Sequence, residues 1–192
     1  VMIQQECKDL LPKYLRFVRG VVDSEDIPLN ISRETIQDDI NIKKIKKVLM
    51  NKFLGKLEEL SNEETEKYNN FWNEFGRMLK EGFTQDFEYR DKLKELMRFN
   101  SSTCKDEKEL ISLKDYVSLM QNDQKEIYYS SGNSRNLIEK SPHLEIFKKK
   151  NIPVIYLFDP LDDLVMSHLL EYDGKKIKPI DQANLDFLNK DD

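Results

Sequence analysis

The stretch that decides the fold class is Glu126–Phe158, EIYYSSGNSRNLIEKSPHLEIFKKKNIPVIYLF. Its two ends, Glu126–Ser130 and Ile152–Phe158, are short and rich in β-branched and aromatic residues, which is typical of strands. Between them, Ser141-Pro142 predicts the start of a helix with proline at its first position, where no backbone N–H is needed. Strand, helix and strand in this order predict a parallel pair joined by a right-handed crossover.

The sequence on both sides extends this unit. Upstream, Ser112-Leu-Lys-Asp115 predicts a capped short helix. Downstream, Asp159-Pro160 is expected to cap a further helix that contains Leu164, Val165 and Leu169. Gly174 then predicts a turn into a last short strand near Ile177. Together these elements indicate a small α/β subdomain with a βαβ unit.

A pair of long helices is predicted further towards the N-terminus. From about Arg33 to Leu60 the apolar residues recur mostly at steps of three or four, as on an amphipathic helix. Ser61-Asn-Glu-Glu64 has the pattern of a capping box and predicts that a second helix starts there and reaches about Phe83. The two helices are expected to pack as a stem, with a shorter helix near 90–97 folded back on them.

The first residues of the chain predict a third kind of structure. Residues 1 to about 26 read as short extended segments, typical of the end of a larger α/β unit. An opening strand would need partners that the chain does not supply, which indicates truncation. The expected fold class is therefore mixed α/β (α+β). Its parts are the end of an α/β subdomain at 1–35, a helical stem at 36–105 and a small α/β subdomain at 106–192.

Composition excludes several classes of function. Lys and Arg total 31 against 36 Asp and Glu, and a net charge of −5 argues against nucleic acid as a partner. No apolar run approaches the roughly 20 residues that span a bilayer, so no membrane segment is expected. Cys7 and Cys104 stand alone, without the spacing of a zinc site or a disulfide framework. A reducing, cytoplasmic setting fits this cysteine usage.

The loop Asn30-Ile-Ser-Arg33-Glu34 is the most suggestive site in the sequence. Arginine presents a planar fork of donors that suits a carboxylate or a phosphate. The structural alternative is that Asn30 or Ser32 caps the following helix while Arg33 pairs with a nearby carboxylate. The residues alone leave both interpretations open.

The predicted strand ends form a second candidate site. In open α/β sheets ligands bind at the carboxyl ends of the strands, here near Ser131-Gly132-Asn133 and Asp159. A single glycine makes no phosphate cradle, and Asp159, Asp162 and Asp163 are better explained as helix caps than as metal ligands. Neither histidine has the spacing of a catalytic or metal motif, and both are expected to be structural: His143 and His168.

One long block of the sequence resembles a known family. Leu11-Pro-Lys-Tyr-Leu-Arg-Phe-Val-Arg-Gly-Val-Val-Asp-Ser-Glu-Asp-Ile-Pro-Leu-Asn-Ile-Ser-Arg-Glu34 is similar to the middle-domain signature of the heat-shock protein 90 family. Further blocks follow in family order: Phe71-Trp-Asn-Glu-Phe75, Leu79-Lys-Glu-Gly82, Ile127-Tyr-Tyr129, Ser141-Pro-His-Leu-Glu145 and Glu171-Tyr-Asp-Gly174. Several of them resemble the bacterial HtpG group more than the eukaryotic cytosolic forms, and a mitochondrial member stays open.

The resemblance implies a part of a larger ATPase. In this family a homodimer carries an N-terminal ATP-binding domain, a middle domain and a C-terminal dimerisation domain. The chain would be part of the middle domain, without a cofactor site and without enzyme activity of its own, while the parent would use ATP and magnesium. Arg33 would contact the γ-phosphate across the domain boundary, with Asn30 and Gln37 as polar neighbours.

The resemblance also implies partner proteins. The family binds unfolded or client proteins through apolar surface. Leu164, Val165 and Met166 lie where exposed apolar residues of the second subdomain are expected, although about half of such positions must belong to the core. Two other interpretations stay open. The chain could be an interaction scaffold in which Arg33 forms a structural ion pair, or an independent α/β enzyme that uses the strand ends near Asp159.

Overall fold

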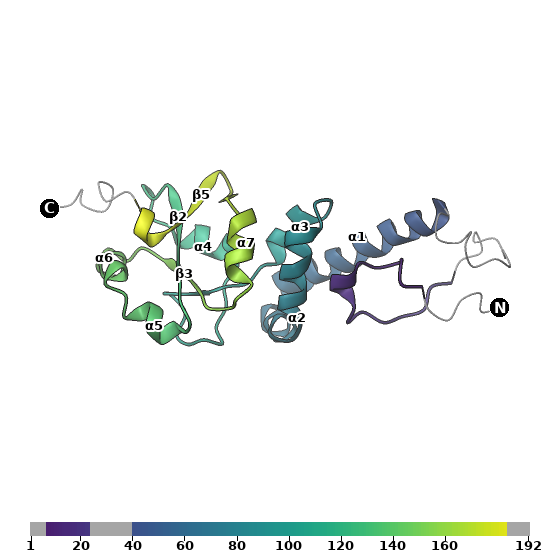
Figure 1. The fold of residues 1–192 in the computed structure, drawn as a ribbon, viewed down its shortest axis with the longest axis horizontal. Coiled ribbons are helices and arrows are strands. Elements are labelled where there is room, and N and C mark those ends of the chain that lie inside the picture. Colours follow the sequence, from purple (N-terminus) through teal and green to yellow (C-terminus); the bar gives the residue numbers. More distant parts are fainter. Residues whose placement is uncertain (1–6, 24–39, 184–192) are drawn as a thin grey trace. The chain divides into compact units, whose positions relative to one another are not determined.

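The computed structural model describes residues 7–23 and 40–183. The chain divides into two compact units, residues 1–82 and 83–192. The described elements are mixed α and β, as the sequence predicts, with seven α-helices and a five-stranded sheet among them (Figure 1).

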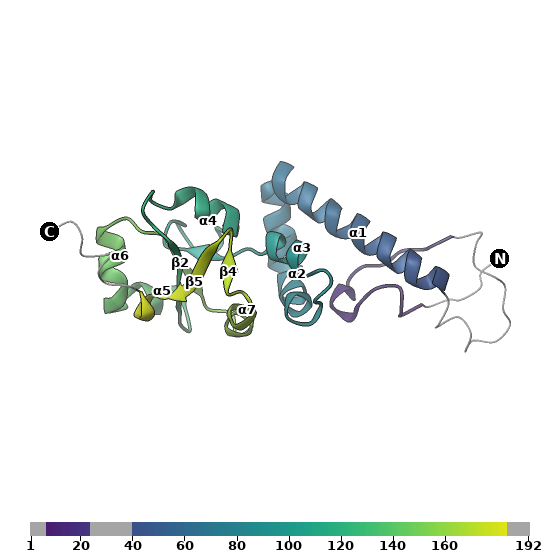
Figure 2. The ribbon, with the colours of Figure 1, turned by 90° about the horizontal axis from the view of Figure 1, so that it is seen from above.

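The described part of the first unit contains two long helices and the segment 7–23, in which no strand is found. The segment contains one turn of 3₁₀ helix, η1 (Lys13–Leu15). Helix α1 (Ile40–Glu63) is followed, after the single residue Glu64, by α2 (Thr65–Gln85), whose last turn passes into the second unit. Figure 2 shows the two helices meeting at an angle at this interruption.

The predicted capping box at Ser61 is wrong. Ser61 lies inside α1, and its hydroxyl donates to the carbonyl of Glu58 at 2.8 Å. A serine that bonds back to its own helix cannot cap the next one. The backbone N–H of Glu64 still bonds the carbonyl of Leu60 at 2.9 Å, so the first helix persists to the interruption.

The apolar stripes of both helices are buried. On α1 the buried side chains of the predicted stripe include Ile42 and Leu57, at 6% and 5% exposure. On α2 they include Tyr68 and Leu79, both at 0%. These residues recur at steps of three, four and their sums, so the helical periodicity read from the sequence does correspond to a buried face.

The second unit is built on a mixed sheet, with order β1-β3-β2-β5-β4. Its elements are α3 (Arg90–Leu96), β1 (Asn100–Ser101), α4 (Leu113–Leu119), β2 (Glu126–Ser131), α5 (Arg135–Glu139), η2 (Pro142–Leu144), α6 (Glu145–Lys149), β3 (Val154–Leu157), α7 (Asp162–His168), β4 (Glu171–Tyr172), β5 (Lys175–Pro179) and η3 (Ile180–Gln182).

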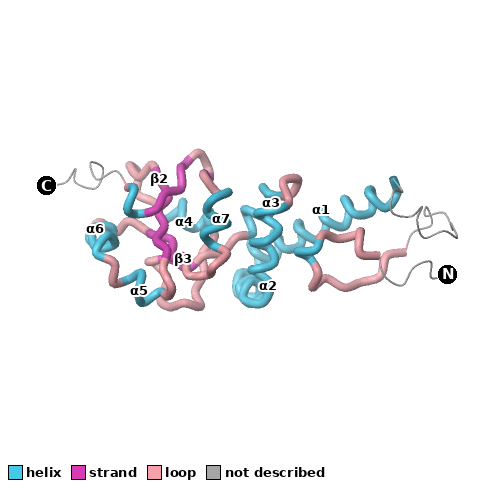
Figure 3. The backbone as a smooth tube through the Cα atoms, in the orientation of Figure 1, coloured by secondary structure: helices cyan, strands magenta, loops and turns pink. Residues whose placement is uncertain are grey.

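The central strand β2 has a parallel neighbour on each side. Tyr128 is opposite Val154 of β3, which confirms the predicted parallel pair, and Ile127 is opposite Ile177 of β5. The two edge strands, β1 and β4, run antiparallel to their neighbours. Figure 3 shows β2 and β3 side by side within the unit.

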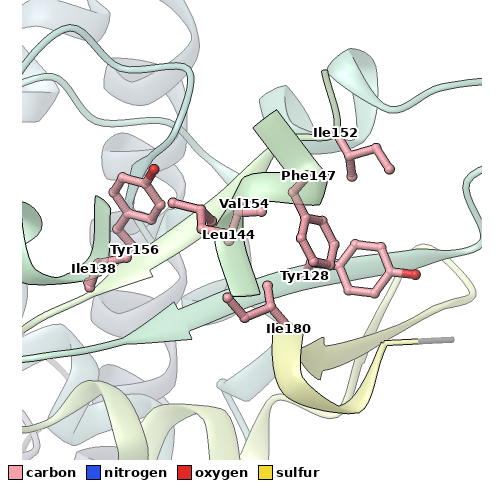
Figure 4. Packing of buried hydrophobic residues seen from close by; sticks show 8 residues of the cluster. All are labelled: Tyr128, Ile138, Leu144, Phe147, Ile152, Val154, Tyr156 and Ile180. Carbon is pink, nitrogen blue, oxygen red and sulfur yellow. The ribbon is translucent and has the colours of Figure 1, made fainter. Parts of the chain in front are cut away.

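Helices cover both faces of this sheet. Figures 1 and 2 show α5 and α6 on one face and α4 and α7 on the other. The core beneath α5 and α6, drawn in Figure 4, consists of Tyr128, Ile138, Leu144, Phe147, Ile152, Val154, Tyr156 and Ile180. Neighbouring residues such as Ile127 and Ile155 are also buried, at 0% and 1% exposure, because successive side chains of a strand point to opposite faces.

Local signals in the sequence explain several element ends. The Ser112 hydroxyl accepts from the Asp115 N–H at 3.0 Å and the Asp115 carboxylate accepts from the Ser112 N–H at 2.9 Å, which confirms the capping box of α4. Pro142 opens η2 as predicted. Gly174, with φ of +70°, makes the turn between β4 and β5.

Arg135 connects α5 to the chain around β1. Its guanidinium donates to Asn100 Oδ1 at 2.5 Å, to the Ser101 carbonyl at 3.1 Å and to the Cys104 carbonyl at 2.6 Å. It also pairs with Glu139 at 2.9 Å, and its side chain is only 11% exposed. One planar fork thus donates to several buried acceptors, of which the Ser101 carbonyl also accepts from the Cys104 N–H at 3.0 Å.

Candidate functional site

The catalytic residues expected from the sequence, Arg33, Asn30 and Gln37, lie outside the described residues. The described chain on either side of them is residues 7–23 and α1. The geometry of these two flanks is therefore what the structure contributes to the site.

Tyr14 is the first anchor of the N-terminal flank. It is 4% exposed, and Leu15 beside it is 1% exposed. A Cβ placed on Gly82 of α2 would lie 2.6 Å from the Tyr14 ring, so the ring packs directly on the backbone of the helix. A glycine is needed at this close approach.

Arg16 is the second anchor, and it pairs with Glu81. Its two terminal nitrogens donate to the two carboxylate oxygens at 2.7 and 3.2 Å, a bidentate geometry. The hydrogen bonds lower the pKa of Glu81 and raise that of Arg16, because each partner stabilises the charged form of the other. The Arg16 side chain is 50% exposed, so the pair fixes orientation more than it adds stability.

Phe17 is the third anchor and contacts both helices. Its ring is stacked on Phe75 of α2, with centroids 4.4 Å apart, and meets Phe71 edge-on at 5.8 Å. It also lies 6.1 Å from Phe53 of α1. Phe17 therefore joins the N-terminal flank of the segment 24–39 to the helix that forms its other flank.

These contacts connect sequence blocks that are far apart. Tyr14, Arg16 and Phe17 belong to the block that starts at Leu11, and their partners belong to the blocks 71–75 and 79–82. The sequence did not predict these contacts. Arg16 and Glu81 are 65 positions apart, and neither charge nor periodicity shows which glutamate pairs with a given arginine. The site described by these residues is called the anchor below: Tyr14, Arg16, Phe17, Phe75, Glu81 and Gly82.

The predicted client surface in the second unit is only partly exposed. Leu164 is 47% exposed, whereas Val165 is 0% and Met166 6% exposed. Val165 and Met166 are therefore among the apolar positions that belong to the core, and the client-binding role of this surface stays a prediction. Three consecutive residues of a helix cannot share one face, and two of these belong to the buried side of α7.

The carboxylates of Asp159 and Asp162, which follow β3, accept hydrogen bonds from backbone N–H groups of the same turn. Asp159 Oδ1 accepts from the Leu161 N–H at 2.9 Å, and Asp162 Oδ2 accepts from the Asp159 N–H at 3.2 Å. Ser131 donates to Asp163 at 3.3 Å, which links the end of β2 to α7. Within residues 7–23 and 40–183 no cluster of three His, Cys, Asp or Glu side chains could hold a metal ion.

A shallow depression lies elsewhere on the second unit. Its volume is about 360 Å³, and its lining consists of Lys94, Glu95, Lys114, Val117, Tyr172 and Asp173. The Tyr172 hydroxyl donates to Glu95 at 2.7 Å, and burial raises the pKa of this phenol. Two lysines and two carboxylates leave the depression without a dominant charge, so it favours neither an anion nor a cation.

Neither cysteine forms a disulfide bond. Cys7 and Cys104 are both free, and burial raises the pKa of the Cys104 thiol. Among the helices that the structure describes, none has the length and apolar character needed to cross a membrane.

Comparison with known proteins identifies the class to which this fold and anchor belong. The model of the Hsp90 protein family matches residues 1–192. The chain therefore belongs to the Hsp90 family.

Within that family the chain is similar to bacterial chaperones named HtpG. It is 49% identical to chaperone protein HtpG of Geobacter sulfurreducens over 185 residues, which is 96% of this chain and 28% of that protein. It is 47% identical to that of Desulfitobacterium hafniense over 191 residues (100% and 31%) and 49% identical to that of Chlorobium phaeovibrioides over 187 residues (97% and 30%). The chain spans about three tenths of the length of these curated relatives.

Proposed function

We propose that this chain is a middle-domain segment of an ATP-dependent Hsp90-type chaperone and that it supplies Arg33 to the ATPase site. The observation that carries the proposal is the anchor. The block that holds Arg33 begins with Tyr14, Arg16 and Phe17, and these residues hold its first half against α1 and α2.

Arg33 would act on a nucleotide held by another domain of the same chain. A cation placed against the charge that develops on the transferring phosphoryl group accelerates the reaction by about 10³–10⁵ for arginine fingers. Such a residue needs no nucleotide pocket of its own. Asn30 and Gln37 would orient the guanidinium or the phosphate, and ATP with magnesium would be bound by the parent protein.

The parent is proposed to be a cytoplasmic homodimer that acts on unfolded or client proteins. Its N-terminal ATPase domain and its C-terminal dimerisation domain would be the segment's partners within the same chain. Of the residues expected to contact clients, Leu164 supports this role through its exposed side chain, while Val165 and Met166 are buried. The proposed client contact in the described residues is accordingly centred on Leu164.

Replacement of Arg33 in the full-length parent tests the catalytic role. Arg33→Ala is expected to lower kcat by at least about 10³-fold, because the transition state loses its cation, while the affinity for ATP stays within about twofold. Arg33→Lys should rescue poorly, since an ammonium lacks the planar fork of donors. Steady-state ATPase kinetics and calorimetric titration of ATP measure the two quantities.

The same experiment separates the proposal from a scaffold function. If Arg33→Ala left turnover unchanged and lowered the thermal stability of the chain, Arg33 would be a structural ion pair. The segment would then contribute only binding surface to the parent.

A further inference from the structure

The greater part of α1 carries a run of positive charge. Residues 40–57 contain neither aspartate nor glutamate, and they include six lysines: Lys43, Lys44, Lys46, Lys47, Lys52 and Lys56. The whole chain has a net charge of −5, so the run lies within an acidic background. A role in solubility does not explain these lysines, because they bring the net charge closer to zero.

Four residues of this run form one exposed surface. Lys44, Val48 and Lys52 follow one another at steps of four, which places them on one side of the helix. Lys47 lies beside them, and the three lysines are exposed, while Val48 is 53% exposed. Leu57, on the opposite side of α1, is buried. Lys44, Lys47, Val48 and Lys52 are called the lysine face below.

The described carboxylates do not neutralise the lysine face. Lys56, further along α1, pairs with Glu59 at 2.5 Å, but within residues 7–23 and 40–183 no lysine of the lysine face forms an ion pair. Lys44 and Lys47 are three positions apart, a spacing at which like charges destabilise a helix. The arrangement therefore lowers the stability of α1 as long as no anionic group lies against it.

The shape and composition of the lysine face indicate the kind of partner. The exposed side of a helix is convex, so it does not enclose a small molecule. Lys44 and Lys52 are eight residues apart, which is about 12 Å along the helix and roughly two turns of a second helix. An apolar centre with a charged rim is the usual composition of a protein–protein interface.

We propose that the lysine face is a docking surface for an acidic protein: a partner helix packs an apolar residue on Val48 and places carboxylates beside Lys44, Lys47 and Lys52. Nucleic acid and anionic membranes are disfavoured, because the acidic remainder of the chain would be repelled by them. An acidic patch on a protein can instead match the lysine face alone. The inference does not depend on the function proposed for Arg33.

The test uses the full-length parent and a synthetic helical peptide that carries leucines on one side and glutamates on both flanks of them. Fluorescence anisotropy measures the affinity at several salt concentrations. Lys44→Glu combined with Lys52→Glu is expected to weaken binding at least about tenfold at low salt, because attractive charge pairs become repulsive. The affinity of the parent should fall as salt is added.

A matched control makes the same change in net charge outside the lysine face. Lys67→Glu combined with Lys149→Glu replaces two exposed lysines, each of which pairs with a glutamate. This variant is expected to bind the peptide within about twofold of the parent, because net charge alone does not form the site.

Circular dichroism melting shows whether the variants are folded. Lys44→Glu combined with Lys52→Glu should not lower the melting temperature. The introduced carboxylates lie three positions before Lys47 and four positions before Lys56, so that repulsive pairs become attractive ones. A loss of binding in this variant then reports on the surface and not on the fold.

A second peptide, with alanine in place of each leucine, tests the role of Val48. Loss of the leucines is expected to weaken binding to the parent at least about fivefold, as removal of an apolar anchor does. Val48→Ser should abolish most of this difference, because the contact is already lost. Leu137→Ser, at a residue of α5 that is 56% exposed, should leave the difference unchanged.

The outcomes decide between the possible partners. Failure of the parent to bind the peptide, or equal affinities in the two charge-reversed variants, would overturn the proposal. So would a leucine effect that persists in Val48→Ser. Tighter binding to phosphatidylserine vesicles or to an oligonucleotide, lost in Lys44→Glu with Lys52→Glu, would assign the face to a membrane or a nucleic acid instead. Arg33→Ala should bind the peptide as the parent does, so a failure of the proposed function remains distinguishable.

Discussion

At the scale of single residues, the contact between Gly82 and Tyr14 gives the sharpest prediction. A methyl group at Gly82 would lie 2.6 Å from a ring that is 4% exposed and has little room to move. Gly82→Ala is expected to lower the free energy of unfolding by about 1–3 kcal/mol, as overpacking does in other cores. Urea denaturation of the chain measures the change.

Gly55 of α1 is the matched control for this substitution. A Cβ at Gly55 would meet nothing within 4 Å. Gly55→Ala should therefore raise the free energy of unfolding by about 0.5–1 kcal/mol, because alanine loses less entropy in a helix. Equal effects of the two substitutions would show that helix propensity, and not the Tyr14 contact, determines the result.

The sequence predicted side-chain contacts between residues that are close in the chain, but not contacts between distant residues. The hydroxyl of Ser112 and the carboxylate of Asp115 are three positions apart, and their capping box was predicted and is confirmed. The partner of Arg16 is 65 positions away, and sequence offered no means of choosing Glu81. The apolar composition of α7 did not reveal which of Leu164, Val165 and Met166 belong to the core, because it does not show which side of the helix faces the sheet.

At the scale of elements, Arg135 connects α5 to β1 through hydrogen bonds to Asn100 and Ser101. Arg135→Ala would leave Asn100 Oδ1 and the carbonyls of Ser101 and Cys104 without this donor, in residues that are at most 5% exposed. The expected loss is about 1–3 kcal/mol in the free energy of unfolding, the usual cost of unsatisfied buried groups. Arg135→Lys should recover only part of it, since one ammonium cannot reproduce the fork.

Lys149→Ala provides the comparison for Arg135. Lys149 pairs with Glu145 on α6, and both side chains are about 70% exposed (72% and 68%). Its removal should change the free energy of unfolding by no more than about 0.5 kcal/mol. A loss as large as that of Arg135→Ala would mean that general charge, and not the buried fork, stabilises this unit.

The elements themselves were predicted well where pattern and length agreed. Strands β2 and β3 and the long stem helices follow from apolar runs and helical periodicity. The edge strands β1 and β4 were missed, because each has two residues and no alternation to detect. The parallel pairing of β2 with β5 was also missed, since it joins strands separated by β3 and α7 and no local signal specifies it.

At the scale of the whole molecule, the chain by itself is expected not to bind ATP. Its sequence has no glycine-rich phosphate loop and no Walker pattern. Calorimetric titration of the 192-residue chain with ATP and magnesium should give no binding heat, while the full-length parent should bind. Micromolar affinity in the isolated chain would contradict the split site that the proposed function requires.

At this scale the sequence blocks were sufficient to predict the family of the chain. The resemblance is confirmed by the family match over residues 1–192. The division at 35 and 105 stays a prediction, as does the role of Arg33. Both depend on contacts with parts of the protein that local patterns do not specify.

The position of β2 between two parallel partners has a consequence for biosynthesis. β3 and β5 both follow β2 in the sequence, and β5 begins at Lys175, 49 positions after Glu126 (175 − 126). A ribosome that adds roughly 5–20 residues per second needs roughly 2–10 seconds to cover this distance. During that time the edge of β2 that later pairs with β5 has no partner strand in the nascent chain. A chain with this strand order would depend on protection from aggregation while it is being made.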